Sequence, residues 1–188
     1  MKIKLLIGLG NPGTEHKNTY HNVGKLFIDE LAGEGVRFKK EKYFEYVKSR
    51  QLPPKADPPQ AENANSQELV LAKTLTFMNQ SGGGVAAAKK YFNSKPVEIL
   101  IIHDDSDIPL GSFKLSFGRG GAGHHGVESI IKSLRTKRFY RLRIGIRPKN
   151  QKKRIKAGQL VLKKISNGDK ELLKRVFRKI RVLLARNE

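Results

Sequence analysis

The sequence predicts an α/β protein: one globular domain over residues 1–188, built on a twisted mixed β-sheet surrounded by α-helices. Short apolar runs alternate along the chain with segments whose apolar residues recur at helical spacing. A length of 188 residues with 38% hydrophobic content falls in the range of one domain with a substantial core. We find no internal repeat in the chain.

The first apolar run, residues 3–9, is interrupted only by Lys4, which is typical of a central strand covered on both faces. A glycine turn follows this strand. Apolar residues then recur at helical spacing from Val23 to Leu31, and Gly33 supplies a stop signal. The N-terminal part of the chain therefore predicts a strand, a loop and a helix.

Two further strands, residues 43–49 and 68–73, flank the segment 51–66, in which four prolines and several polar residues forbid regular structure. We expect an extended, mobile hairpin loop there. The next segment, residues 81–92, predicts a helix that begins with Ser81 as its cap and packs an apolar face on the sheet.

Another apolar strand, residues 97–102, is expected to end abruptly where the polar segment 103–107 begins. Sheets of this kind bind ligands at the carboxyl ends of their parallel strands, so this polar segment marks a candidate site. The remaining chain predicts a strand, a glycine-rich loop, a helix, a strand and a basic amphipathic helix, at residues 112–117, 118–123, 126–134, 140–146 and 169–188.

Basic residues greatly outnumber acidic ones. The 38 Lys and Arg against 17 Asp and Glu give a formal net charge of +21 and a pI near 10.3. This excess predicts a polyanionic partner, nucleic acid before an anionic membrane surface. The absence of cysteine excludes disulfides, zinc ribbons and thiol nucleophiles and fits a cytoplasmic protein, and no apolar segment approaches the ~20 residues that span a bilayer.

The segment 8–13 (GLGNPG) has the glycine spacing of a dinucleotide-binding turn, with Asp29 and Glu30 placed for a ribose contact. Two features argue against that use. Pro12 removes an amide that could bind a pyrophosphate, and the helix begins too late for its N-terminus to lie under the turn. The turn instead places Asn11 at the carboxyl end of a strand, although an ordinary turn residue is the simpler alternative.

His21 and Asp104 follow different strands of one sheet, so they are able to meet at its carboxyl edge. A carboxylate that accepts the imidazole N–H fixes the tautomer and raises the basicity of the ring, so the other nitrogen can take a proton from water. The acidic segment also leaves turn residues or a hard-cation site open. A metal-dependent phosphoesterase would draw on His103, Asp104, Asp105, Asp107, His124 and His125.

Two other segments carry candidate side chains. In residues 77–79, Met78 could line a pocket and Asn79 could fix a substrate amide, or the segment is an ordinary loop with an apolar plug. Residues 120–126 (GGAGHHG) combine exposed amides with a helix N-terminus, which suits a phosphate or an oxyanion as well as a flexible loop.

Together these segments resemble bacterial-type peptidyl-tRNA hydrolase over nearly the whole chain. The matching motifs arrive in order: residues 9–13, Thr19, His21, Asn22 and Gly24, residues 76–79, Ser81, Gly82, His103, Asp104, Asp107, Pro109, Gly111, Gly123, His124, Gly126 and residues 141–146. The resemblance implies hydrolysis of the ester that joins a peptide to the 3′-terminal ribose of tRNA, which releases tRNA for reuse in translation. It implies no cofactor and no metal ion. The expected partner is peptidyl-tRNA, held by its acceptor arm and its peptide on a monomeric enzyme.

At the matching positions, the resemblance implies that His21 activates water as general base and that Asp104 orients it. Asn11 and Asn79 would bind the peptidyl part near the scissile ester, and Met78 would line that channel.

The resemblance places His124 and His125 beside the substrate and assigns the clamping of tRNA phosphates to Arg143. From charge we add its neighbours Lys114, Arg119 and Arg141. The basic C-terminal helix is expected to contact the tRNA body or to cover the mouth of the channel.

Several positions depart from the family pattern. His125 stands where the family usually has Asn, and an imidazole cannot both donate and accept from one arm as a carboxamide does. Weaker activity or an altered pH profile follows, and a catalytically weak or inactive RNA-binding relative is the alternative function. His16 and Tyr20 replace an aromatic residue and an arginine, so the rim of the site is expected to differ. A basic residue is missing near Ser116, and Arg119 is a candidate replacement.

Overall fold

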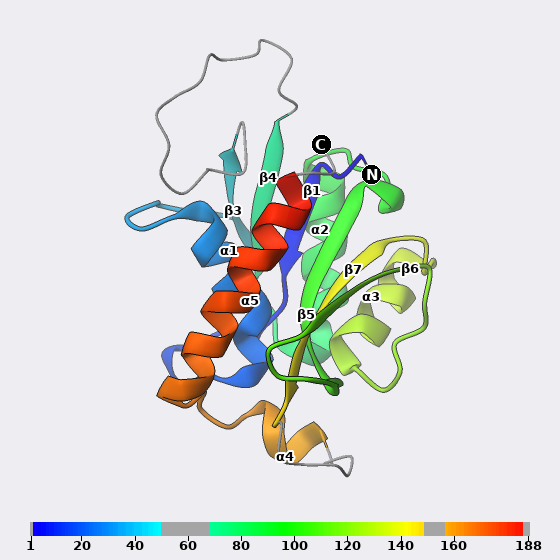
Figure 1. Ribbon diagram of the computed structural model, residues 1–188. Coiled ribbons are helices and arrows are strands. Elements are labelled where there is room, and N and C mark those ends of the chain that lie inside the picture. The colour runs from blue at the N-terminus through cyan, green and yellow to red at the C-terminus, as the bar shows by residue number, and fades with distance from the viewer. Residues whose placement is uncertain (1, 50–67, 149–156, 186–188) are drawn as a thin grey trace.

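The computed structural model describes residues 2–49, 68–148 and 157–185, with the side chains of residues 157 and 159 left undescribed. In these ranges a seven-stranded mixed sheet has the order β2-β3-β4-β1-β5-β7-β6 (Figure 1). The strands are β1 (Leu5–Gly8), β2 (Lys39–Lys40), β3 (Phe44–Ser49), β4 (Leu69–Thr74), β5 (Ile99–Pro109), β6 (Phe113–Phe117) and β7 (Tyr140–Arg147). The four central strands β4, β1, β5 and β7 run parallel, and the outer strands are antiparallel to their neighbours. The predicted α/β class and mixed sheet are confirmed.

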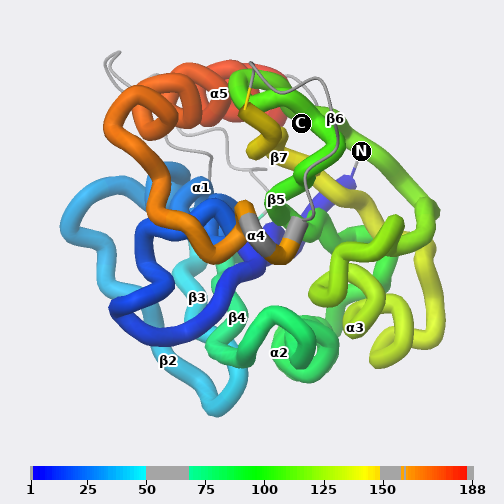
Figure 2. Tube along the Cα trace, turned by 90° about the horizontal axis from the view of Figure 1, so that it is seen from below, coloured from blue at the N-terminus to red at the C-terminus, as the bar shows by residue number. Residues whose placement is uncertain are grey.

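Helices cover both faces of this sheet, and on each face one buried apolar cluster lies between the helices and the strands. One face carries α1 (Val23–Ala32) and α5 (Asn167–Ala185), and the other carries α2 (Ser81–Tyr91) and α3 (His125–Leu134). The short helix α4 (Ala157–Val161) lies against the carboxyl end of β5, at the end of the molecule that faces the viewer in Figure 2. Four 3-10 turns complete the described part: η1 (Thr14–His16), η2 (Tyr20–Asn22), η3 (Met78–Gln80) and η4 (Pro96–Glu98).

Strand β5 continues beyond the predicted end at residue 102, through the polar segment to Pro109. The prediction is wrong here because the neighbouring strand β7 goes on pairing: His103 lies opposite Arg143 and Asp104 opposite Ile144. The polar residues therefore belong to the strand. Pairing with β7 holds residues 103–105 in place, and the register then shifts between Asp105 and Pro109. The expected Ser81 cap is also wrong, since Gln80 occupies the cap position and the Ser81 hydroxyl contacts the Met78 sulfur at 3.7 Å.

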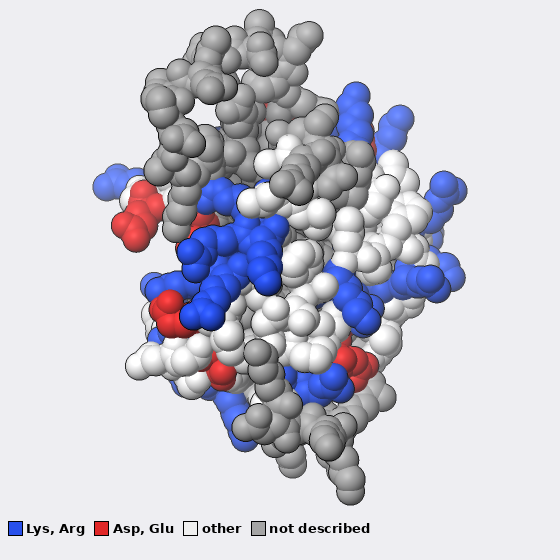
Figure 3. Space-filling view, viewed as in Figure 1, with Lys and Arg blue, Asp and Glu red and all other residues white. Residues whose placement is uncertain are grey.

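Helix α5 confirms the predicted amphipathic pattern. Its apolar stripe is buried in the larger cluster, through Leu173, Val176, Phe177, Ile180 and Leu184. Lysine and arginine side chains gather over its outer face, as Figure 3 shows. The predicted loop at 51–66 and the last residues of the predicted helix, 186–188, lie outside the described residues. Among the described helices, none has the length and apolar character that crossing a membrane requires.

Candidate active site

His21 lies on η2, which is held against the end of the sheet by its neighbours. Helix α1 begins directly after this turn, and a Cβ on Gly24 would collide with the backbone carbonyl of Ile102 on β5. Only glycine permits so close an approach. Next to His21, the Asn22 side chain bonds to the backbone of Asn11, accepting from its N–H at 2.8 Å and donating to its carbonyl at 3.0 Å. The turn that carries the histidine is thus held against β5 and against the loop that follows β1.

One carboxylate oxygen of Asp104 contacts the imidazole rings of two histidines. Its Oδ1 is 2.7 Å from His21 Nδ1 and 3.2 Å from His124 Nε2, and the residue is only 1% exposed. The two imidazole rings lie 5.4 Å apart, centroid to centroid. The predicted meeting of His21 and Asp104 at the carboxyl edge of the sheet is therefore present in the structure, with His124 as a third member.

The tautomer of His124 follows from its place at the start of α3. His124 is the N-cap residue, and its Nδ1 accepts a hydrogen bond from the Val127 N–H at 3.2 Å. A neutral imidazole that accepts at Nδ1 carries its proton on Nε2, so His124 donates to Asp104. The helix cap makes His124 a fixed donor to the carboxylate.

Asp104 is a carboxylate in this environment. Burial raises its pKa, but the opposing effects of His21 and His124 are together larger and hold the pKa well below the usual range. A carboxylate accepts, so His21 donates through Nδ1, and its Nε2 is left as the proton acceptor. This arrangement is that of a general base oriented by a buried acid.

His103 has a structural role: it is buried and supports a neighbouring side chain of the site. Its ring is buried and its Nδ1 donates to the Asp104 carbonyl at 2.6 Å. Burial lowers its pKa well below the usual value, and the nearby His124 lowers it further, so the ring is neutral. It packs edge-on against His124, with ring centroids 4.5 Å apart, and so supports the side chain that donates to Asp104.

The six residues of the metal alternative are not brought together. His103 is buried, Asp105 accepts from Arg143 Nε at 2.7 Å, and the His125 side chain is 79% exposed. A different trio, His21, Asp104 and His124, has ligand atoms within 4.8 Å of one another, the one such group in the described ranges. Binding a metal through His124 Nε2 would remove its proton and break the helix cap, so this trio is better suited to sharing protons.

An apolar pocket of about 450 Å³ opens beside His21. It is lined by Asn11, His21, Phe77, Met78, Asn79, Gln80, His125, Gly158, Val161 and Leu162. The Asn11 Oδ1 accepts from the Met78 N–H at 2.8 Å, so Asn11 has its Nδ2 donor to offer a ligand. Met78 is mostly buried, and a Cβ on Gly126 would collide with its sulfur. Val161 and Leu162, which the sequence did not indicate, are brought to the site by α4 and the residue after it from a distant part of the chain.

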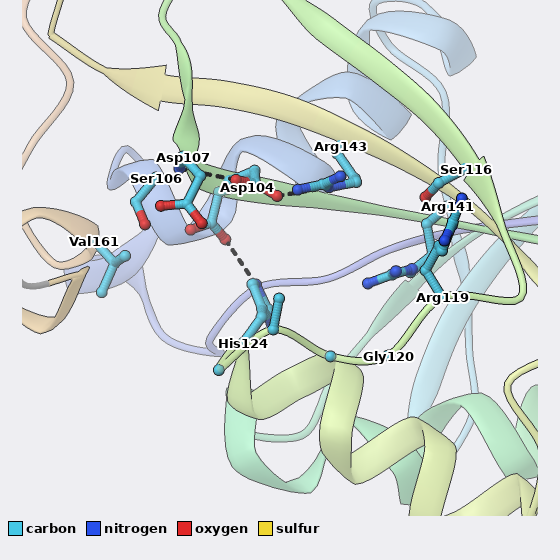
Figure 4. Close-up of a pocket in the computed structure, with 14 residues that line it drawn as sticks. Asp104, Ser106, Asp107, Ser116, Arg119, Gly120, His124, Arg141, Arg143 and Val161 are labelled. Atoms are coloured by element: carbon cyan, nitrogen blue, oxygen red, sulfur yellow. Dashed lines mark hydrogen bonds and ion pairs between the residues drawn. The ribbon is translucent and has the colours of Figure 1, made fainter. Parts of the chain in front are cut away.

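A second, larger pocket of about 900 Å³ lies on the other side of Asp104 and His124 (Figure 4). Arg119, Arg141 and Arg143 line it, together with Ser116 and the glycine-rich loop 120–123. Arg141 is buried, and its Nε and the Ser116 Oγ are buried without a partner in the described structure. Burial, and the charge of Arg143, lower the pKa of Arg141, as expected for two cations held side by side.

Three of the four predicted tRNA-binding residues therefore share one pocket, and Lys114 does not line it. Lys114 lies opposite Arg143 in the β6–β7 ladder and so shares its face of the sheet, but it is exposed. No basic side chain stands at Ser116, which lines the pocket beside Arg141. Arg119, the candidate replacement, enters the same pocket from the glycine-rich loop.

Gly8, the first glycine of residues 8–13, permits close packing of a helix on the sheet. A Cβ on Gly8 would collide with the backbone of Gly24, so this glycine lets α1 approach β1. Asp29, the candidate ribose ligand, pairs instead with Lys73 Nζ at 2.6 Å. The dinucleotide alternative is not supported by this geometry.

An α/β fold with a buried carboxylate that contacts an imidazole beside an apolar pocket has the groups that a hydrolase site requires. Comparison with known sequences identifies which family of hydrolases this is: the family model described as peptidyl-tRNA hydrolase matches residues 5–186. The chain belongs to the peptidyl-tRNA hydrolase family.

Individual relatives agree with this assignment. The chain is 43% identical over 145 residues to the peptidyl-tRNA hydrolase of a Neisseria meningitidis serogroup C strain, covering 77% of this chain and 70% of the relative. It is 38% identical over 169 residues to that of Arthrobacter sp., covering 89% and 80%. The crystal structure of peptidyl-tRNA hydrolase from Acinetobacter baumannii superposes with a TM-score of 0.78 at 30% identity, over 99% of this chain and 90% of that one.

Proposed function

We propose that this chain hydrolyses the ester between a peptide, or an N-blocked amino acid, and the 3′-terminal ribose of tRNA, with His21 as the general base. The 2.7 Å bond between His21 Nδ1 and the buried Asp104 carboxylate carries this proposal, because it leaves His21 Nε2 free to accept a proton beside the apolar pocket. The test is deacylation of N-acetyl-aminoacyl-tRNA by the purified protein in excess chelator. Release of free tRNA supports the proposal, and RNA binding without release contradicts it.

The proposed reaction has two proton transfers. His21 Nε2 takes a proton as water attacks the ester carbonyl, and Asp104 stabilises the imidazolium that forms. When the tetrahedral intermediate collapses, the carbon–oxygen bond to the ribose breaks and the imidazolium returns the proton to the leaving ribose oxygen. The products are the free carboxylic acid and the tRNA with its hydroxyl restored.

Amide groups surround the expected position of the ester. Asn11 would donate through Nδ2 because its Oδ1 already accepts from Met78, and Asn79 would reach the substrate from the rim of the pocket. We propose that the peptide lies in the apolar pocket, between Phe77 and the wall formed by Val161 and Leu162. His124 would act on the reaction through its bond to Asp104.

We propose that the larger pocket binds a tRNA phosphate. The support is a buried guanidinium, Arg141, whose Nε has no partner in the described structure, beside Arg143, Arg119 and a glycine-rich loop. The positive charges of Arg141, Arg143 and Arg119 would attract a phosphate into this pocket.

Replacing Arg143 by glutamine is expected to raise KM about tenfold with little change in kcat, and to reduce the slope of log(kcat/KM) against log[salt] by about 1. Glutamine can still donate to Asp105, so the change removes charge without orphaning that carboxylate. Steady-state deacylation between low and moderate salt measures both effects. The matched control is Arg138→Gln, at an exposed arginine that does not line the pocket. Equal salt slopes for the two variants would refute the phosphate assignment.

The outer face of α5 is proposed as a second contact for the tRNA body. Its exposed cations Lys174, Arg175, Arg178 and Lys179 belong to the positively charged surface over this helix. Deleting the helix is a poor test because five of its apolar side chains lie in the core. The same salt titration with Arg178→Gln tests this face without disturbing packing.

His125 is expected to weaken the enzyme relative to an asparagine at the same position. The side chain is exposed, lines the apolar pocket and lies 4.0 Å from Glu128. Asparagine offers a donor and an acceptor together, so His125→Asn should raise kcat/KM about two- to tenfold. Profiles of kcat/KM from pH 6 to 8 for both proteins are the measurement. Superimposable profiles would show that His125 does not contact the substrate.

We propose further that the chain works as a monomer in the cytoplasm. Every group assigned a role above comes from one chain, and the substrate is an intermediate of translation. The alternative of an inactive RNA-binding relative is not favoured, because His21, Asp104 and His124 are all in bonded contact.

A further inference from the structure

Tyr20 is buried next to His21 and does not lie at the rim of the site, where its position in the sequence predicted it. Its ring is 6% exposed and belongs to the apolar cluster under α1 and α5. Its hydroxyl donates to the Asp169 carboxylate, in the first turn of α5. The residue before His21 is thus bonded to a helix that begins almost 150 residues later in the chain.

Backbone contacts run beside this bond. The Tyr20 N–H donates to the Lys163 carbonyl at 3.2 Å, and the Ile165 N–H donates to the Asn18 carbonyl at 2.8 Å. Thr19 and Lys164 form an antiparallel bridge between these two hydrogen bonds. The segment that leads from α4 into α5 therefore lies along the turn that presents His21.

His21 is consequently held from both sides in the sequence. On one side Tyr20 is bonded to Asp169, and on the other the Asn22 side chain is bonded to the Asn11 backbone. The His21 imidazole must meet Asp104 at 2.7 Å and also direct Nε2 toward the pocket. A small rotation of η2 would change both, since the turn is only three residues long.

We propose that Tyr20 is a positioning residue for His21, and that its hydroxyl acts by fixing η2 to Asp169 at the start of α5. The inference rests on the proposed function and adds a residue that acts on the reaction through His21. Burial raises the pKa of Tyr20, and the bond to Asp169 raises it further, so the phenol keeps its proton and donates across the working pH range. A donor to a carboxylate is a strong and directional contact.

Tyr20→Phe removes only the hydroxyl. We expect kcat to fall about tenfold while KM stays within about twofold, because misplacing a catalytic group affects the transition state more than substrate binding. The matched control is Tyr46→Phe: Tyr46 is also 6% exposed and bonded through its hydroxyl, to Tyr91 at 3.1 Å, on a strand that does not line either pocket. Its kcat and KM should match those of the wild type.

Substitutions of Asp169, the partner of the Tyr20 hydroxyl, provide a second test of the same contact. Asp169→Asn retains an oxygen that accepts from the phenol, so its kcat should stay near that of the wild type, whereas Asp169→Ala should fall as Tyr20→Phe does. The double variant Tyr20→Phe/Asp169→Ala should be no slower than either single variant. The NMR signal of the His21 Nδ1–H proton should shift in Tyr20→Phe and not in Tyr46→Phe.

Several results would overturn the inference. These are a wild-type kcat for Tyr20→Phe, equal losses in Tyr20→Phe and Tyr46→Phe, or a loss that follows the unfolded fraction in thermal melts. All three require an active wild-type enzyme. A wild type without deacylation would instead refute the proposed function, so the two failures are distinguishable.

Discussion

Alanine in place of His21 is expected to lower kcat for deacylation of N-acetyl-aminoacyl-tRNA by about 10²- to 10⁴-fold, the usual contribution of a positioned general base. The variant loses the nitrogen that accepts the proton of water, while both pockets keep their other lining residues. KM should therefore change little. Single-turnover rates with enzyme in excess measure the chemical step directly.

His16 provides the matched control. It lies on the neighbouring turn η1, 3.5 Å from Glu15, and lines neither pocket. His16→Ala should retain the wild-type rate. If His21→Ala also retained it, another group would have to activate the water, and the proposed mechanism would be wrong.

Asparagine in place of Asp104 is expected to lower kcat on the order of 10³-fold, although the shape of the side chain is preserved. An amide cannot accept from His21 and His124 as a carboxylate does, and when its NH₂ faces His21 Nδ1 it favours the tautomer that protonates Nε2. His21 would then hold a proton on the nitrogen that must accept one.

The same substitution has an effect on stability whose sign follows from the pKa of Asp104. Because the pKa is lowered in the folded protein, ionised Asp104 adds stability above its unfolded pKa of about 4, and this is lost as the pH falls. Asp104→Asn lacks this increment at neutral pH. The control is Asp29→Asn, a more exposed carboxylate paired with Lys73 away from the site, which should keep wild-type kcat. Unfolding curves for both variants separate lost stability from lost catalysis, and equal kcat values for the two would contradict the assigned role.

The sequence was sufficient to predict that His21 and Asp104 meet, because parallel strands bring their carboxyl ends to one edge. It was not sufficient for the end of β5, since the polarity of residues 103–107 indicates a loop, while residues 103–105 go on pairing with β7. Local patterns cannot show what a neighbouring strand will do.

The role of His124 depends on a feature that the sequence contains but does not make evident. Histidine is not among the common cap residues, yet here its Nδ1 caps α3 and its Nε2 is thereby committed to Asp104. The place of Tyr20 was harder still to predict, since its partner Asp169 is far along the chain and only the packing of α5 brings them together. The glycine spacing of residues 8–13 does not by itself distinguish close helix packing from phosphate binding, because both require glycine.

The most direct test of the central claim is whether His21 and Asp104 act as one unit. Single-turnover deacylation rates are needed for the wild type, His21→Ala, Asp104→Asn and the double variant, all in excess chelator. Groups that act together lose their contribution only once, so the double variant should be no slower than His21→Ala within about twofold. If the two losses instead multiply in the double variant, Asp104 does not act through His21 and the mechanism is contradicted.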